Sequence, residues 1–350
     1  MLPQVARLGA LALGVASCHA TVAADAEHRP LTCSSWQLDT ELDAAKLPGF
    51  VRGFGLAEDG TLFVASYDSY GGRTSMGSRR GAWNKELLPE GFDNLRDLFV
   101  AGNIPWVTGT TYSSGKGHVW LARPDGKKWV DVGLPPGGKS VVTMGGTSAH
   151  TFLVASIEPG DFPTLFEWTS TGWVSVPSPL EIGARPFRVV RLGTRIVLVG
   201  ALADAPSLAA FDGERWSTIL APTSVWWVSD VSGTVDGLIV LGGDRDGVAS
   251  VWSVRDRGRA WTLVHSSDWP YAGIWSPRSG VALLTPSIYH YGRLTVLDGA
   301  AGPSLLPKVD PNVAVYSVAG PWVEADGRTV HLLVEHYADR TMHHYTGTCD

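Results

Sequence analysis

Tryptophan recurs at an almost constant interval along this chain, and the interval restricts the fold more than any other feature of the sequence. Six of the 15 tryptophans stand 43 to 47 residues apart, each at the start of a short strand-like segment. They are Trp36, Trp83, Trp129, Trp173, Trp216 and Trp261. One further step reaches residues 302–309 around Ser304, a degenerate copy without tryptophan. A fixed period of this length indicates a repeat architecture, and seven units fit the chain.

Each unit also contains a nearly continuous apolar run, and these runs indicate how the units pack. The clearest runs are residues 62–65, 152–155, 196–199, 238–241 and 281–284. A strand with one wet face alternates apolar and polar residues, whereas these runs are apolar throughout and must be covered on both faces. Four-stranded sheets stacked around an axis provide that cover, while a two-sheet sandwich leaves its outer faces wet. The sequence therefore predicts an all-β, seven-bladed β-propeller.

Composition supports this fold and argues against two classes of partner. Hydrophobic residues make up 44% of the chain and charged residues 18%, which excludes a disordered chain. The 41 glycines, 22 prolines and 15 tryptophans are too many for a helical bundle. The formal charge of −6 argues against binding to nucleic acid or an anionic membrane, because both need a concentrated basic surface. We predict a monomer without a cofactor.

The two ends of the chain are predicted to complete one blade together. Residues 34–39 form a fourth strand without three strands before it, and residues 313–348 supply three strands without a fourth. Cys33 and Cys349 stand where the missing turn would be. In an oxidising compartment we predict a disulfide between them, closing a loop of 349 − 33 = 316 residues. Two free thiols are the alternative.

The N-terminal segment has the features of an export signal. Arg7 precedes an apolar stretch over residues 8–15 that is too short to remain in a bilayer. Residues 15–18, Val-Ala-Ser-Cys, resemble the bacterial lipobox, which implies lipid attachment at Cys18. This reading gives a signal peptide at residues 1–17, a tether at residues 18–32 and the propeller at residues 33–350. Cleavage at residues 24–26 is the alternative; it would discard Cys18 and release a secreted or periplasmic protein.

Two resemblances to known families concern the hairpins. Residues 256–261 resemble the Asp-box of sialidase-like propellers, with Val254 where Ser or Thr is usual, which implies a structural turn role for Asp256. The arginine triad and six-blade count expected of a sialidase are not evident, so that catalytic apparatus is not carried over. More generally, the mature chain is similar to bacterial extracytoplasmic propellers with FDGxxW-type repeats, seen at residues 211–216. That group shares an architecture and not one activity.

Motifs with direct chemical meaning are few. Residues 133–140, GLPPGGKS, match the phosphate-loop pattern, but two prolines and a following strand-like run favour a turn between blades. Neither a GxSxG elbow nor an HExxH helix occurs. Four histidines near the C-terminus, His331, His336, His343 and His344, are expected in outer or rim positions of strands. Adjacent strand residues point to opposite faces, so His343 and His344 cannot share a site, and we predict no metal centre.

Candidate ligand-binding residues gather in three loops between second and third strands, in blades that circular order places side by side. Aromatic faces mixed with carboxylates and arginines suit sugar or peptide recognition. The alternative is that the tyrosines only cap a polar rim. The residues are Tyr67, Asp68, Tyr70 and Arg73 in the first loop, Tyr289, His290 and Tyr291 in the second, and Glu335, His336, Tyr337, Asp339 and Arg340 in the third.

These observations predict a binding or scaffold module and leave catalysis open. We expect an exported lipoprotein of the cell envelope that binds a protein or carbohydrate ligand and meets the membrane only through its lipid. The alternative is a glycan- or lactone-processing enzyme in which Asp68, Glu335 and Asp339 act as acid and base. The separation of facing carboxylates would distinguish the two.

Overall fold

The part of the chain that the computed structural model describes is almost entirely strand and turn. It consists of residues 36–39, 47, 50–68, 73–86, 88, 92, 94–110, 117–122, 129–157, 163–192, 195–202, 205–234, 237–255, 258–268, 271–278, 281–286, 295–298, 302–305, 315–323, 328–336 and 342–349. These residues belong to one compact unit, Leu31–Asp350. The predicted signal peptide, the tether and Cys18 lie outside the described residues.

The described strands form seven four-stranded antiparallel sheets, six of them from four consecutive strands. Those six are β2–β5 (Phe50–Leu56, Leu62–Asp68, Arg73–Arg80, Ala82–Glu86), β6–β9 (Asn94–Ala101, Ile104–Thr110, Gly117–Ala122, Trp129–Asp131), β10–β13 (Ser140–Gly146, Thr151–Ser156, Thr164–Thr169, Gly172–Val176), β14–β17 (Arg185–Leu192, Arg195–Leu202, Ala205–Phe211, Trp216–Ile219), β18–β21 (Trp227–Thr234, Gly237–Gly243, Ala249–Arg255, Ala260–Ser267) and β22–β25 (Tyr271–Arg278, Val281–Pro286, Thr295–Asp298, Gly302–Leu305). The all-β prediction is confirmed.

The seventh sheet, which we call the composite sheet, joins the two ends of the chain. Its order is β1 (Gln37–Asp39), β28 (Met342–Thr348), β27 (Thr329–His336) and β26 (Val315–Val323). Gln37 lies opposite Thr346, and Asp39 lies opposite His344. The N-terminal strand therefore pairs with the C-terminal strands, as the sequence predicted.

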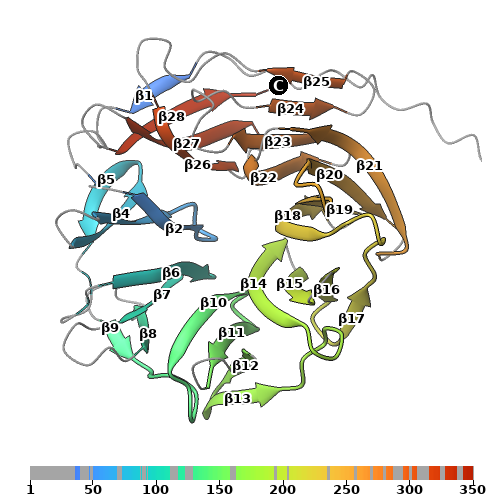
Figure 1. Cartoon of the computed structure of the whole chain (residues 1–350). Coiled ribbons are helices and arrows are strands. Elements are labelled where there is room, and N and C mark those ends of the chain that lie inside the picture. The colour runs from blue at the N-terminus through green and yellow to red at the C-terminus, as the bar shows by residue number, and fades with distance from the viewer. Residues whose placement is uncertain are drawn as a thin grey trace, which may run out of the picture. The chain divides into compact units, whose positions relative to one another are not determined.

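Neighbouring sheets contact one another through their first strands, in the order in which they follow along the chain. β2 contacts β6, and the series continues through β10, β14, β18 and β22 to β26, which contacts β2. Figure 1 shows these strands around a common axis, with the composite sheet beside sheet β2–β5. The three sheets that carry the predicted binding loops are therefore consecutive.

The hydrophobic core lies between the sheets and is supplied mainly by second strands. Val197 and Val199 in β15 pack with Val228 in β18 and Val240 in β19, and three of these four side chains have no exposed surface. Full burial of a side chain of this size stabilises the fold by about 1.5 to 3 kcal/mol. The prediction that the apolar runs are covered on both faces is confirmed for the described second strands.

Five of the six repeating tryptophans lie in fourth strands and are only half buried, whereas Trp36 directly precedes β1 and is buried. Trp173 donates its indole N–H to the carbonyl of Gly133 at 3.1 Å, and Trp261 donates to the carbonyl of Gly258 at the same distance. An indole suits this position because its ring covers apolar surface while its N–H bonds to the backbone. The period visible in the sequence thus marks the outer strands and not the core.

The structure describes one of the two turn motifs found in the sequence. Residues 133–140 connect β9 to β10 as a turn, in which the Gly138 amide donates to the Pro135 carbonyl at 2.8 Å and the Lys139 amide donates to the Ser156 carbonyl at 2.9 Å. No helix begins there, so the rejection of a phosphate loop is confirmed. Asp256 lies outside the described residues, and its structural role stays a prediction.

Candidate functional site

We call the end of the ring at which second and third strands are connected the loop end, and the opposite end the turn end. Most of the predicted binding residues lie in loop-end segments outside the described residues. These are Tyr70, Tyr289, His290, Tyr291, Tyr337, Asp339 and Arg340. The backbone positions of Tyr67, Asp68, Arg73 and Glu335 are described, and Asp68 pairs with Arg73 where β3 and β4 meet the loop. The prediction for this group stays a prediction.

His336 is a correction to the predicted loop site. It belongs to β27, and its side chain is only 7% exposed. Its Nε2 lies 3.0 Å from the hydroxyl of Tyr345, and its ring stacks on His343 with centroids 3.7 Å apart. The ring is therefore packed inside the composite sheet. We remove His336 from the candidate ligand contacts.

The four C-terminal histidines are buried and not, as predicted, in outer or rim positions. His331 and His344 bond to each other, with Nδ1 and Nε2 2.9 Å apart, while His336 and His343 stack separately. The alternation predicted for His343 and His344 is confirmed, since the two belong to different pairs. A buried histidine ring must satisfy its nitrogens within the protein, which accounts for the hydrogen bond between His331 and His344.

A cavity of about 600 Å³ lies along the first strands of four consecutive sheets, and we call it the central cavity. It touches β2, β6, β10 and β14. Phe54 and Phe187 give it apolar surface, while Arg96, Asp97 and Arg188 give it charge. Its volume lies within the range of pockets that bind small ligands.

One repeated backbone feature builds the wall of this cavity. The first strand of every sheet has a bulge near its loop end, at which one residue has no partner on the second strand. The bulged positions are Arg52, Arg96, Val142, Phe187, Ser229, Ala272 and Tyr316. A bulge bends its strand and turns side chains out of the regular alternation, which accounts for Arg96, Val142 and Phe187 lining the cavity.

In two of the sheets, the residue that follows the bulge forms hydrogen bonds to the first strand of the next sheet. Asp97 accepts hydrogen bonds from the Met144 amide at 3.1 Å and the Thr143 hydroxyl at 3.3 Å. Asp230, three sheets further on, accepts from the Ile274 amide at 3.3 Å and from the Val231 amide at 2.8 Å. The two carboxylates occupy equivalent places and fasten neighbouring first strands together.

Burial sets the electrostatics of these carboxylates. It raises the pKa of Asp97 to about 6, against the opposing effect of the amide and hydroxyl donors and of Arg188. Burial also raises the pKa of Asp230, with Arg188 as the largest opposing influence. Arg188 donates to the Ser229 carbonyl at 2.9 Å and lies 3.2 Å from Asp230. Arg96, by contrast, is exposed and has no ion pair among the described residues, which leaves its guanidinium available to a ligand.

A group of aromatic and basic side chains marks the loop end of sheet β18–β21. The Arg245 guanidinium carbon lies 5.1 Å from the ring centroid of Trp226, and His265 Nε2 lies 3.2 Å from the Tyr271 hydroxyl. Burial lowers the pKa of His265, so the ring is neutral near pH 7. Sequence reasoning missed this group because it examined only three loops. The paired tryptophans at 226 and 227 were an available signal.

Within the part of the chain that the structure describes, no three His, Cys, Asp or Glu side chains are arranged to hold a metal ion. The buried carboxylates Asp97 and Asp230 are held by backbone amides of the adjoining sheets. The described lining of the central cavity therefore combines guanidinium groups and aromatic surface with a carboxylate that backbone amides already hold.

Comparison with solved structures agrees with the radial order of the sheets. The chain has a β-propeller fold. A catalytically inactive virginiamycin B lyase from Staphylococcus aureus, solved with quinupristin, has 13% identity and a TM-score of 0.58 and covers 90% of this chain and 99% of its own. The Pan2 WD40 domain of Neurospora crassa has 12% identity and a TM-score of 0.58, with 92% and 96% covered.

A third propeller extends this range of functions. The propeller domain of the Trilobed protease from Pyrococcus furiosus, described as having an open velcro topology, has 9% identity and a TM-score of 0.58, with 87% and 95% covered. Identities this low show the fold alone, and propellers carry unrelated functions. No protein-family model matches the chain. No curated protein matches it either.

Proposed function

We propose that this protein is an exported, lipid-anchored β-propeller that binds a protein or glycan partner at its loop end. The central cavity carries the proposal, because it combines two phenylalanine rings with an exposed Arg96 that forms no ion pair with any described residue. Guanidinium groups form hydrogen bonds with the polar groups of a ligand, while aromatic rings pack against its flat apolar surface. The Trp226 and Tyr271 groups extend this chemistry around the loop end.

Closure of the ring is part of the same proposal. We infer a seven-bladed ring in which the composite sheet is the last blade and Cys33 is bonded to Cys349. Cys349 is 2% exposed and follows directly after β28. Continuing the pairing of Gln37 with Thr346 by three residues would set Ser34 opposite Cys349, one residue from Cys33. Such a bond would hold the loop-end surfaces of neighbouring sheets in fixed positions.

Export and anchoring rest on the N-terminal sequence. Among the described residues, no helix has the length and apolar character needed to cross a membrane. We propose attachment through a lipid on Cys18, in an extracytoplasmic location, with one copy of the chain per assembly. Labelling of cells with a radioactive fatty acid tests the attachment, and Cys18→Ser should abolish the label.

The binding function is tested by replacing two predicted contact residues together. The double substitution Tyr67→Ala and Tyr289→Ala should abolish retention of the partner when immobilised protein is exposed to envelope extract or to a glycan array. Lys85→Ala, on the outer strand β5, is the matched control and should retain it. A double variant that stays folded and binds as well as the parent would contradict partner contacts at these two loop-end tyrosines.

The two partner classes and the enzymatic alternative give different outcomes in this experiment. Retention of a protease-sensitive species indicates a protein partner, and signals on the array indicate a glycan. Release of reducing sugar or of an opened lactone, lost in Asp68→Asn or Asp339→Asn, would instead establish hydrolysis. We favour binding because the described cavity carboxylates are occupied by backbone amides.

A further inference from the structure

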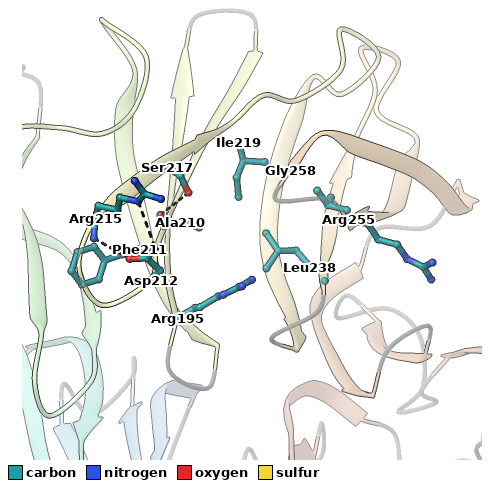
Figure 2. Close-up of a pocket in the computed structure, with 12 residues that line it drawn as sticks. Arg195, Ala210, Phe211, Asp212, Arg215, Ser217, Ile219, Leu238, Arg255 and Gly258 are labelled. Carbon is teal, nitrogen blue, oxygen red and sulfur yellow. Dashed lines mark hydrogen bonds and ion pairs between the residues drawn. The ribbon is translucent and has the colours of Figure 1, made fainter.

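A second cavity lies at the turn end, on the opposite side of the ring from the proposed partner site. It occupies about 180 Å³ between sheets β14–β17 and β18–β21, and we call it the arginine cleft (Figure 2). Residues at the start of β15 and β19 and in the two turns after β16 and β20 line it. Nothing in the proposed function uses this cleft.

Four buried side chains give the arginine cleft an apolar floor. Phe211 and Ile219 come from one sheet, and Leu238 and Val254 come from the other. Ile219, Leu238 and Val254 belong to the hydrophobic core between the two sheets. A ligand with an apolar body would cover the exposed edge of this core.

Three guanidinium groups surround the floor, although the whole chain has a charge of −6. Arg195 is half buried, and its side chain extends toward the side of the cleft that carries Leu238 (Figure 2). Neither Arg195 nor Arg255 has an ion pair with any described residue. The Arg255 side chain extends away from the cleft in Figure 2. Arg195 and Arg215 are the other two arginines of the lining.

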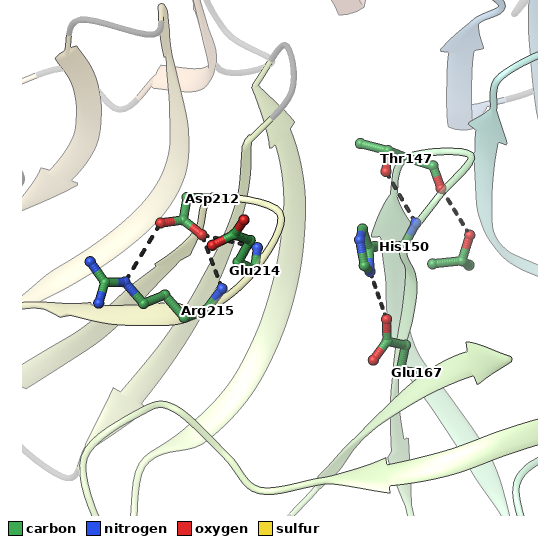
Figure 3. Close-up of polar contacts among 7 residues, drawn as sticks. Thr147, His150, Glu167, Asp212, Glu214 and Arg215 are labelled. Carbon is green, nitrogen blue, oxygen red and sulfur yellow. Dashed lines mark hydrogen bonds and ion pairs between the residues drawn. The ribbon is translucent and has the colours of Figure 1, made fainter.

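Among the described residues of the lining, Asp212 is the one carboxylate, and its own turn already engages it. It accepts hydrogen bonds from the amides of Glu214 and Arg215, each at 3.0 Å (Figure 3). These amides lower the pKa of Asp212. The Arg215 Nε lies 3.9 Å from the same carboxylate, which is a weak and exposed contact. Asp212 therefore fixes the turn without neutralising the cleft.

We propose that the arginine cleft binds a small organic carboxylate. The apolar body lies on the Ile219 and Leu238 floor, and the carboxylate accepts hydrogen bonds from Arg195 and Arg215. Guanidinium groups pair with planar carboxylates through two parallel hydrogen bonds, which a neutral ligand cannot form. The cleft is smaller than pockets for drug-sized ligands, so the ligand is about the size of benzoate. Inorganic phosphate satisfies the arginines but leaves the apolar floor uncovered, and it should bind more weakly.

The test is a titration of the full, ¹⁵N-labelled chain with sodium benzoate, followed by amide chemical shifts. The amides of Gly237 and Gly258 line the cleft and should shift saturably, whereas Gly60 in a remote turn should not. Benzyl alcohol, which has the ring without the charge, should produce no saturable shift. Saturable shifts that are equal for benzoate and benzyl alcohol, or no saturation at millimolar benzoate, would overturn the proposal.

Variants locate the effect at the arginines. Arg195→Gln should raise the Kd for benzoate at least tenfold, the factor that corresponds to about 1.4 kcal/mol. Arg195→Lys should lose part of the affinity, because it keeps the charge but not the paired donors. Arg80→Gln is the matched control, on an exposed arginine of sheet β2–β5, and should bind normally. Arg215→Gln serves as the second variant, and normal binding by both folded cleft variants would refute the assignment.

Discussion

At the scale of single residues, Asp97 forms a contact between two sheets although burial of its negative charge is unfavourable. Its carboxylate joins two sheets through the Met144 amide, yet burial raises its pKa to about 6. Below about pH 4 the group is protonated in both folded and unfolded chains. Between about pH 4 and pH 6 the folded chain keeps a proton that the unfolded chain has lost. Stability attributable to Asp97 therefore falls as pH rises through this window and stays lower above it.

Replacing Asp97 by asparagine should remove this cost. Asp97→Asn keeps an oxygen for the Met144 amide and should raise the free energy of unfolding at pH 7 by on the order of 2 kcal/mol, with little gain at pH 4. Denaturant unfolding at both pH values measures the difference. Asp59→Asn is the control, because amides in its exposed turn lower the pKa of Asp59. A destabilised Asp97→Asn variant at pH 7 would show that the negative charge itself stabilises the contact.

At the scale of the element, the short strand β1 is held by side chains as well as by its pairing with β28. The carboxylate of Asp39 can only accept, so His344 Nδ1 donates to it at 2.9 Å and His344 Nε2 accepts from His331 Nδ1. Arg79 of β4 lies 3.1 Å from the same carboxylate, which links β1 to sheet β2–β5. In this arrangement His344 is neutral, and its one ring proton lies on Nδ1.

Acid should therefore loosen β1 before other strands. Burial, with help from His331 and Arg79, lowers the pKa of His344 to about 3, whereas an unfolded histidine titrates near 6.5. The stabilising effect is complete above about pH 6.5 and decreases as pH falls toward 3. We expect amide hydrogen exchange at residues 37–39, corrected for intrinsic rates, to increase from pH 7 to pH 5 relative to β13. Unchanged relative protection would contradict this account.

At the scale of the whole molecule, the proposed bond between Cys33 and Cys349 determines how firmly the ring is closed. A loop of 316 residues gives a stabilisation of about 6 kcal/mol in the chain-entropy model, which is an upper figure. The paired substitutions Cys33→Ser and Cys349→Ser should lower the Tm and increase exchange in β1. Cys18→Ser, outside the proposed bond, should leave the Tm unchanged. Alkylation of both Cys33 and Cys349 under non-reducing conditions would contradict the bond.

The sequence by itself determined the strand pattern, the stacking of sheets and the pairing of the two chain ends. These features depend on continuous apolar runs and on a period that is visible in single residues, such as Trp173 and Trp216 on fourth strands. The run at residues 196–199 could be predicted to be buried on both faces of its sheet because all four consecutive residues are apolar.

Only the tertiary structure decided where the cavities and their charges lie. The bulged positions share no residue type, so Arg96 and Phe187 give no common signal in sequence although the backbone places them alike. The arginine cleft joins residues of two sheets, and Arg195 is 60 positions from Arg255 (255 − 195 = 60). His336 was predicted to lie in a loop, whereas the structure buries it beside Tyr345 and His343. Such sites depend on contacts between separate repeats, which the period of a single repeat does not encode.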